Sequence, residues 1–122
     1  MKRIIFIGMH NKKGMKPLDS KTMTGKVIDS IIIGLNNSNC IKTNLCECEY
    51  MPVDKQEIQE WNNVWHQKYE PTTKDVVVTL GTWVHENFDQ RSISVVKLGH
   101  PAGQYGTSKK LEYINNAILK IN

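Results

Sequence analysis

The stretch Arg3-Ile4-Ile5-Phe6-Ile7-Gly8-Met9-His10 decides the fold that we expect for this chain. Its apolar run, which stops at a glycine and is followed by a histidine, is typical of a strand buried on both faces of a parallel sheet. Near the other end, Ile93-Ser94-Val95-Val96-Lys97-Leu98 runs into Gly99-His100-Pro101 in the same way. Ligands bind beyond the carboxyl ends of strands in open α/β sheets, so His10 and His100 are predicted to belong to one site.

Between these two stretches the chain alternates strands and helices. Strands are predicted at 3–7, 40–45, 75–80 and 93–98, and helices at 25–35, from Asp54 onwards, at 82–88 and at about 108–119. Asp54 is a natural N-cap, with Glu57 at the spacing of a capping box. The order predicts an α/β fold, a three-layer α/β/α sandwich with a four-stranded parallel sheet.

Apolar residues recur at helical spacing in three of the predicted helices, so these residues are expected to face the core. They are Val27, Ile28, Ile31 and Ile32, then Ile58, Trp61 and Trp65, and finally Leu111, Ile114, Ala117 and Ile118.

Length and composition indicate a single domain that spans residues 1–122. Of its 122 residues, 39% are hydrophobic and 23% are charged, as in an ordinary globular domain. The formal net charge of +4 suits a polyanionic partner without requiring one. The apolar run after Met1-Lys2-Arg3 is too short for a signal peptide, and no stretch approaches the length of a membrane span. We expect a cytoplasmic monomer with no membrane partner.

The cysteines Cys40, Cys46 and Cys48 are predicted to be reduced thiols, because their number is odd and no export signal precedes them. Cys46 and Cys48 would project from one face of an extended segment, which makes a metal pair conceivable. Structural zinc and iron-sulfur sites normally use four ligands, however, and the chain has no second cysteine pair. We therefore predict no metal and no cofactor.

Spacing excludes two nucleotide-binding motifs. Thr24-Gly25-Lys26-Val27 has a Gly-Lys pair, but a phosphate-binding loop needs an earlier glycine, where Ser20 stands, and a Ser or Thr in place of Val27. After the first strand, Gly8 and Gly14 lack the close glycine spacing of a dinucleotide-binding turn. The segment predicted as a loop, 8–24, is long for a strand-to-helix connection, which favours a functional role for it.

Four segments, in this order, resemble motifs of the uracil-DNA glycosylase superfamily. They are Ile4-Ile5-Phe6-Ile7-Gly8-Met9-His10-Asn11, Thr24-Gly25-Lys26-Val27-Ile28-Asp29, Ile41-Lys42-Thr43-Asn44 and Gly99-His100-Pro101-Ala102. In that superfamily a glycine-headed loop follows the first strand, the second strand ends in an asparagine that reads the base, and the last strand ends in His-Pro. The resemblance spans nearly the whole chain and implies a minimal uracil-DNA-glycosylase-like domain.

The nearest branch is the bacterial and archaeal iron-sulfur type. Thr43-Asn44 with Cys48 four residues beyond the asparagine, Val76-Val77-Val78-Thr79-Leu80-Gly81 and His100-Pro101-Ala102 are all similar to its motifs. Only Cys48 falls on a position that matches a cluster ligand of that branch. The chain departs from the branch here, and we predict no cluster.

The first loop also departs from the family. His10 and Asn11 stand where the family usually has an Asp, Asn or Ala and then a proline. Pro17-Leu18 takes the place of a proline and a stacking phenylalanine, so a flat aromatic for the base is expected to be missing.

The resemblance implies a DNA glycosylase of base excision repair, a hydrolase that cleaves the N-glycosidic bond of uracil or of a related damaged or modified base in DNA. Cleavage leaves negative charge on the departing base, and His100 could stabilise it with a hydrogen bond. His10 could orient or deprotonate the attacking water. Asn44 offers both a donor and an acceptor to a pyrimidine edge. The remaining substrate-binding candidates are Gly8, Met9, Asn11 and Leu18.

Contacts with single- or double-stranded DNA are expected from Lys12, Lys13 and Lys109. A base in a duplex must leave the stack, and Tyr105, between glycines in Gly103-Gln104-Tyr105-Gly106, could wedge into the gap.

Each assignment has a plain competitor. The lysines can be solvated surface charges, Tyr105 can pack on the last helix, Asn44 can cap a turn, and His100 can bond to backbone. His66 and His85 lie in helical patterns away from strand ends, and we assign them no role.

A second interpretation is a catalytically lapsed relative that binds a nucleotide or a partner protein. The carboxylate and proline missing from the first loop favour this binding module. Asn44 and His100 at the matching positions favour the enzyme.

Overall fold

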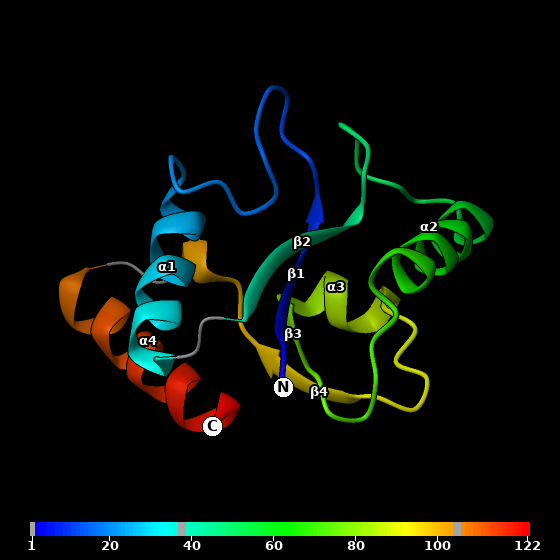
Figure 1. Cartoon of the computed structure of the whole chain (residues 1–122). Coiled ribbons are helices and arrows are strands. Elements are labelled where there is room, and N and C mark those ends of the chain that lie inside the picture. The colour runs from blue at the N-terminus through cyan, green and yellow to red at the C-terminus, as the bar shows by residue number, and fades with distance from the viewer. Residues whose placement is uncertain (1, 37–38, 104–105) are drawn as a thin grey trace.

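The computed structural model describes residues 2–36, 39–103 and 106–122 and forms an α/β fold around one parallel sheet. The strands, in the sheet order β2-β1-β3-β4, are β1 (Ile4–His10), β2 (Cys40–Cys46), β3 (Val76–Leu80) and β4 (Ser94–Leu98). The helices are α1 (Met23–Leu35), α2 (Lys55–Tyr69), α3 (Thr82–Asn87) and α4 (Thr107–Ile121), with the short turn η1 (Pro101–Gly103) after β4. The predicted α/β class and four-stranded parallel sheet are confirmed (Figure 1).

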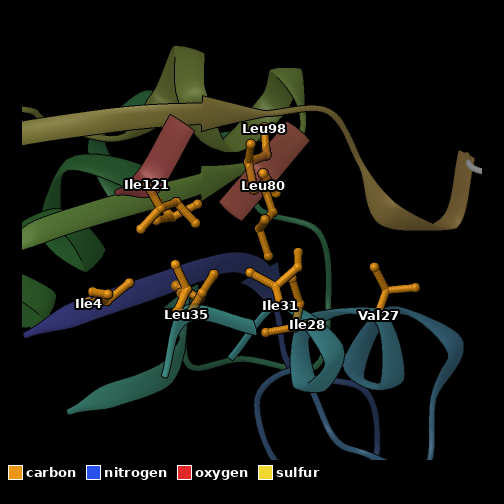
Figure 2. Packing of buried hydrophobic residues seen from close by; sticks show 11 residues of the cluster. Ile4, Val27, Ile28, Ile31, Leu35, Leu80, Leu98 and Ile121 are labelled. Atoms are coloured by element: carbon orange, nitrogen blue, oxygen red, sulfur yellow. The ribbon is translucent and has the colours of Figure 1, made fainter. Parts of the chain in front are cut away.

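Alternation along β1 divides the core between the two faces of the sheet. Ile4 and Phe6 pack into a cluster with α1 and α4, which Figure 2 shows from close by. Ile5 and Ile7 pack into a second cluster with residues of α2 and α3. All four side chains are at most 1% exposed, as expected for a strand covered on both faces.

β1 extends to His10, beyond its predicted end at Ile7, because β2 continues beside it. Gly8 pairs with Asn44, and His10 pairs with Cys46. The prediction that a loop begins at Gly8 is therefore wrong, and the loop begins after His10. Strand length is set here by the neighbouring strand, which the local sequence does not reveal.

All four predicted helices are present, with ends that differ by up to two residues from the prediction. The Asp54 side chain caps α2 by accepting the N–H groups of Gln56 and Glu57, and Trp65, at 2% exposed, lies in the core. Leu111 is 55% exposed, so its predicted inward orientation is wrong. α4 turns Ala117 and Ile121 toward the sheet, and that phase places Leu111 outside. Within the described ranges, no helix has the length and apolar character needed to cross a membrane.

Candidate functional site

A cavity of about 330 Å³ opens at the carboxyl edge of the sheet, where β1, β2 and β3 end. Among the residues singled out in the sequence, those that line it are Gly8, Met9, His10, Lys12, Leu18, Asn44 and His100. Asn11 does not line the cavity but contacts the cavity residue Asn44. Lys13 and Lys109 are exposed and do not line the cavity. The predicted role of Tyr105 falls outside the described residues.

The structure thus brings His10, Asn44 and His100 to one cavity although β2 and β4 are the outer strands of the sheet. The turn after β4 makes this possible, because it carries His100 back over the end of β3. A Cβ atom built on Gly81 would lie 3.4 Å from Cδ2 of His100, so the histidine ring is in van der Waals contact with the backbone at Gly81. Gly81 also has a φ of +88°, a conformation that glycine adopts readily.

Asn44 is held in place from two sides. Its side chain is buried, and its Nδ2 donates a hydrogen bond of 2.8 Å to Oδ1 of Asn11. On the neighbouring strand, a Cβ atom at Gly8 would lie only 2.5 Å from Oδ1 of Asn44. Glycine at position 8 therefore provides the space that the amide of Asn44 occupies. One amide N–H and the amide oxygen of Asn44 remain for a ligand.

The two cavity histidines have complementary hydrogen-bonding states. Nδ1 of His10 lies 3.0 Å from the carbonyl oxygen of Asn11, which only accepts, so in the neutral ring Nδ1 carries the proton and Nε2 is left as an acceptor. Nδ1 of His100 accepts the backbone N–H of Ala102 at 3.1 Å, so the neutral ring carries its proton on Nε2. The site therefore holds one imidazole as a proton acceptor and the other as a hydrogen-bond donor.

The electrostatic surroundings favour the neutral form of His100. Partial desolvation by the surrounding protein lowers the pKa of His100, and the positive charge of Lys12 lowers it further. His100 is therefore a neutral donor at pH 7. Lys12 and Lys16 both line the cavity, and within the described residues neither forms a salt bridge. Together with the carboxylate of Asp19, which also lines the cavity, the two lysines leave one excess positive charge, which suits a phosphate-bearing ligand.

Asn11 connects the two sides of the site. Its side chain accepts from Asn44, its carbonyl accepts from His10, and its N–H donates to the carbonyl of Cys48 at 2.9 Å. Both the amide of Asn44 and the ring of His10 are therefore oriented by one residue. Its placement at the start of the first loop follows directly from the extension of β1 to His10.

Several cavity residues were missed in the sequence. They are Met15, Lys16, Asp19, Thr22, Thr24, Leu80, Gly81, Thr82 and Trp83. Leu18 lines the cavity where the family has a stacking phenylalanine, and the half-buried Trp83 adds an aromatic residue to the lining from a different part of the chain. The position of Trp83 just after Gly81, at the start of α3, was the available signal.

Asp19 brings a carboxylate to the cavity wall, although no carboxylate stands at the family's usual position in the first loop. Its two oxygens accept backbone N–H groups from Lys21 at 2.9 Å and from Lys16 at 3.2 Å. These hydrogen bonds lower the pKa of Asp19, which is therefore anionic at neutral pH. The contacts give the carboxylate a structural role in shaping the loop.

The histidines left without a role have structural partners. Nε2 of His66 donates to the carbonyl of Asp89 at 2.7 Å, and its ring stacks on Phe88. Nδ1 of His85 lies 3.3 Å from Oγ1 of Thr79. Neither histidine lines the cavity.

The cysteines do not form a metal-binding group. Cys46 is buried in the core, and its burial raises the pKa of its thiol to about 12. Cys48 donates to the carbonyl of Tyr50 at 3.3 Å. Across the described ranges, no three His, Cys, Asp or Glu residues lie close enough together to hold a metal ion.

No family model matches the chain, and a search of curated proteins finds no significant match.

Proposed function

We propose that this chain is a DNA glycosylase with the fold of the uracil-DNA glycosylase superfamily, acting on uracil or on a related damaged or modified base. Support comes from the order of the sequence motifs and from the cavity at the carboxyl edge of the sheet, which their residues line. The proposal assigns the cavity to a base that has been extruded from the DNA stack.

In the proposed reaction, a water oxygen forms a bond to C1′ of the deoxyribose while the bond from C1′ to the base nitrogen breaks. The bonding electrons leave with the base, so negative charge develops on its ring and carbonyl oxygens. Nε2–H of His100 donates a hydrogen bond to that charge, which stabilises the transition state more than the ground state. Nε2 of His10 accepts the proton of the attacking water.

One observation carries the proposal: the backbone N–H of Ala102 fixes the tautomer of His100. A neutral imidazole whose Nε2–H is fixed before the substrate arrives needs no reorganisation when charge develops on the leaving base. The lowered pKa of His100 keeps the ring in this state at neutral pH. A histidine that only bonds to backbone at a strand end would make the same contact, so base release is the measurement that separates the two roles.

Recognition of the base is assigned to Asn44 and Trp83. The free N–H and the amide oxygen of Asn44 match the donor and acceptor edge of a pyrimidine. The ring of Trp83 provides an aromatic surface in the same cavity, and stacking on such a surface tolerates several bases.

The binding-module alternative also has an observation in its favour. The cavity's carboxylate, Asp19, accepts two backbone N–H groups, which lower its pKa and make it a weaker base for the activation of water. On this alternative the same cavity holds a nucleotide, and no bond is cleaved.

An assay of base release from single- and double-stranded DNA separates the two functions. Oligonucleotides that contain uracil, hypoxanthine or xanthine are incubated with the protein, and abasic sites are revealed by alkaline strand cleavage. The glycosylase proposal expects strand cleavage at the modified position only. Saturable binding of a free nucleotide without cleavage of any substrate would instead support the binding module.

A further inference from the structure

A groove of about 490 Å³ is lined by residues of α1 and α4. These two helices lie against each other (Figure 1). The groove's apolar floor consists mainly of Met23, which is 51% exposed, and of the partly buried Ile114, whereas Val27 lines the groove with only 5% of its surface exposed. The groove and the cavity share the first turn of α1, because Thr24 lines the cavity whereas Met23 lines the groove.

The charges at the groove are all positive. Lys26 on α1 and Lys110 on α4 line it, and its lining includes no acidic residue. Within the part of the chain that the structure describes, neither lysine forms a salt bridge. The acid one turn along α1, Asp29, is already paired with Lys42. Both lysines are thus available to bind an external anion.

Two available cations beside an apolar floor match a chain that alternates anionic groups with flat apolar surfaces. Single-stranded DNA has this chemistry, because its phosphates are regularly spaced and its bases are unpaired. A duplex presents the same phosphates, but its bases are stacked and cannot lie on Met23 and Ile114. The apolar floor therefore favours a single strand.

We infer that this groove binds the nucleotide next to the one held in the cavity, within single-stranded DNA. Lys26 and Lys110 bind phosphates, and the unstacked base lies on Met23 and Ile114. This inference rests on the proposed function and extends it to a preference for single strands.

The test uses the full chain and the double variant Lys26→Gln/Lys110→Gln. Lys2→Gln/Lys74→Gln is the matched control, since it removes the same charge from exposed lysines that precede β1 and β3, at the opposite edge of the sheet. Binding of a short fluorescent oligothymidylate is measured by anisotropy over a series of salt concentrations. Each lost phosphate contact should reduce the slope of log K against log salt by about 0.7, so the double variant should lose about 1.4 and the control nothing. Equal slopes for the two double variants would overturn the inference.

Three further probes test the occupant. An oligothymidylate with an abasic spacer beside the central nucleotide should bind more weakly than the intact strand, and a duplex of the same length should also bind more weakly. If the intact strand, the strand with the abasic spacer and the duplex bound with equal affinity, the proposal that a base lies in the groove would be wrong. A polyglutamate peptide that bound as tightly as the oligothymidylate would identify an acidic protein as the partner instead.

Failure of this inference can be distinguished from failure of the proposed function. If the wild type releases no base but the double variant still loses oligothymidylate binding, the glycosylase proposal fails and the strand-binding groove stands. If base is released and the double variant binds as the control does, the groove inference fails alone.

Discussion

Gly8→Ala tests the packing of the site most sharply, because its effect can be worked out from one contact. The added Cβ would lie 2.5 Å from Oδ1 of Asn44 and 3.1 Å from Cδ2 of Leu18, so the amide must move. Its movement breaks the 2.8 Å hydrogen bond from Asn44 to Asn11. Loss of such a bond costs about 0.5–1.5 kcal/mol of folding free energy.

A compensating term acts in the opposite direction. Gly8 lies in a strand and its φ is not positive, so alanine fits the backbone. Alanine also lowers the conformational entropy of the unfolded chain, which stabilises the fold by about 0.4–1 kcal/mol. The net change in the free energy of unfolding is therefore expected to stay within about 1 kcal/mol of zero. Base recognition has no such compensation, because a displaced amide leaves a polar edge of the ligand unpaired. That loss amounts to about 1–3 kcal/mol, or roughly 5- to 150-fold in kcat/KM.

The matched control is Gly99→Ala, since nothing lies within 4 Å of a Cβ at Gly99 and its φ is not positive. Urea unfolding, base release and the side-chain amide signals of Asn44 in ¹H–¹⁵N NMR are measured for both variants. We expect Gly8→Ala to shift the Asn44 signals and lose activity at nearly unchanged stability, whereas Gly99→Ala should match the wild type. Unchanged Asn44 signals and full activity in Gly8→Ala would refute the proposed packing.

Three other predictions concern stability and the aromatic wall. Hydrogen bonds from Arg3 are the main cause that lowers the pKa of Asp75 from 3.8 to about 2. The pair should therefore stabilise the fold by about 2 kcal/mol above pH 4, and this stabilisation should be lost as the pH falls from 4 to 2. Asp75→Asn should lose it at pH 7 in urea unfolding, and a loss below about 0.5 kcal/mol would contradict the assignment. Burial lowers the pKa of His66 below 6.5, so the unfolded chain takes up a proton at this residue before the folded chain does, and stability should fall as the pH drops below 6.5. His66→Gln should flatten this dependence of stability on pH between pH 7 and 5, and an unaltered slope would contradict the role of His66. Trp83→Ala should weaken binding of a base-containing ligand by about 1–3 kcal/mol while Trp83→Phe retains most of it, and equal losses in both variants would show that the ring does not stack on the base.

The sheet could be predicted from the sequence because its strands carry their own signal. β1 and β3 are apolar runs bounded by polar residues and glycine, and burial on both faces requires such runs. The end of β1 could not be predicted, because Gly8, Met9 and His10 are held in the strand by β2 and not by their own propensity. The exposure of Leu111 could not be predicted either. Helical spacing identifies an apolar face, but the packing against the sheet decides which residues of the helix are buried.

The candidate site could be predicted in part. His10, Asn44 and His100 follow or end strands, and parallel topology places all such residues at one edge. Asp19 and Trp83 could not be placed, since they reach the cavity through the path of a loop and the start of a short helix. The tautomers of the two histidines depend on single backbone groups, the carbonyl of Asn11 and the N–H of Ala102, which no sequence pattern specifies.

The most direct test of the proposed function compares base release from uracil-containing DNA by the wild type, His100→Ala and the control His85→Gln. His85 lies outside the cavity, so the control variant also removes one histidine but leaves the cavity lining unchanged. We predict that the wild type and His85→Gln release uracil, and that His100→Ala loses about 2.7–4 kcal/mol of transition-state stabilisation, or 10²- to 10³-fold in kcat, with unchanged DNA affinity. A wild type that releases no base, or a His100→Ala variant as active as the wild type, would contradict the account.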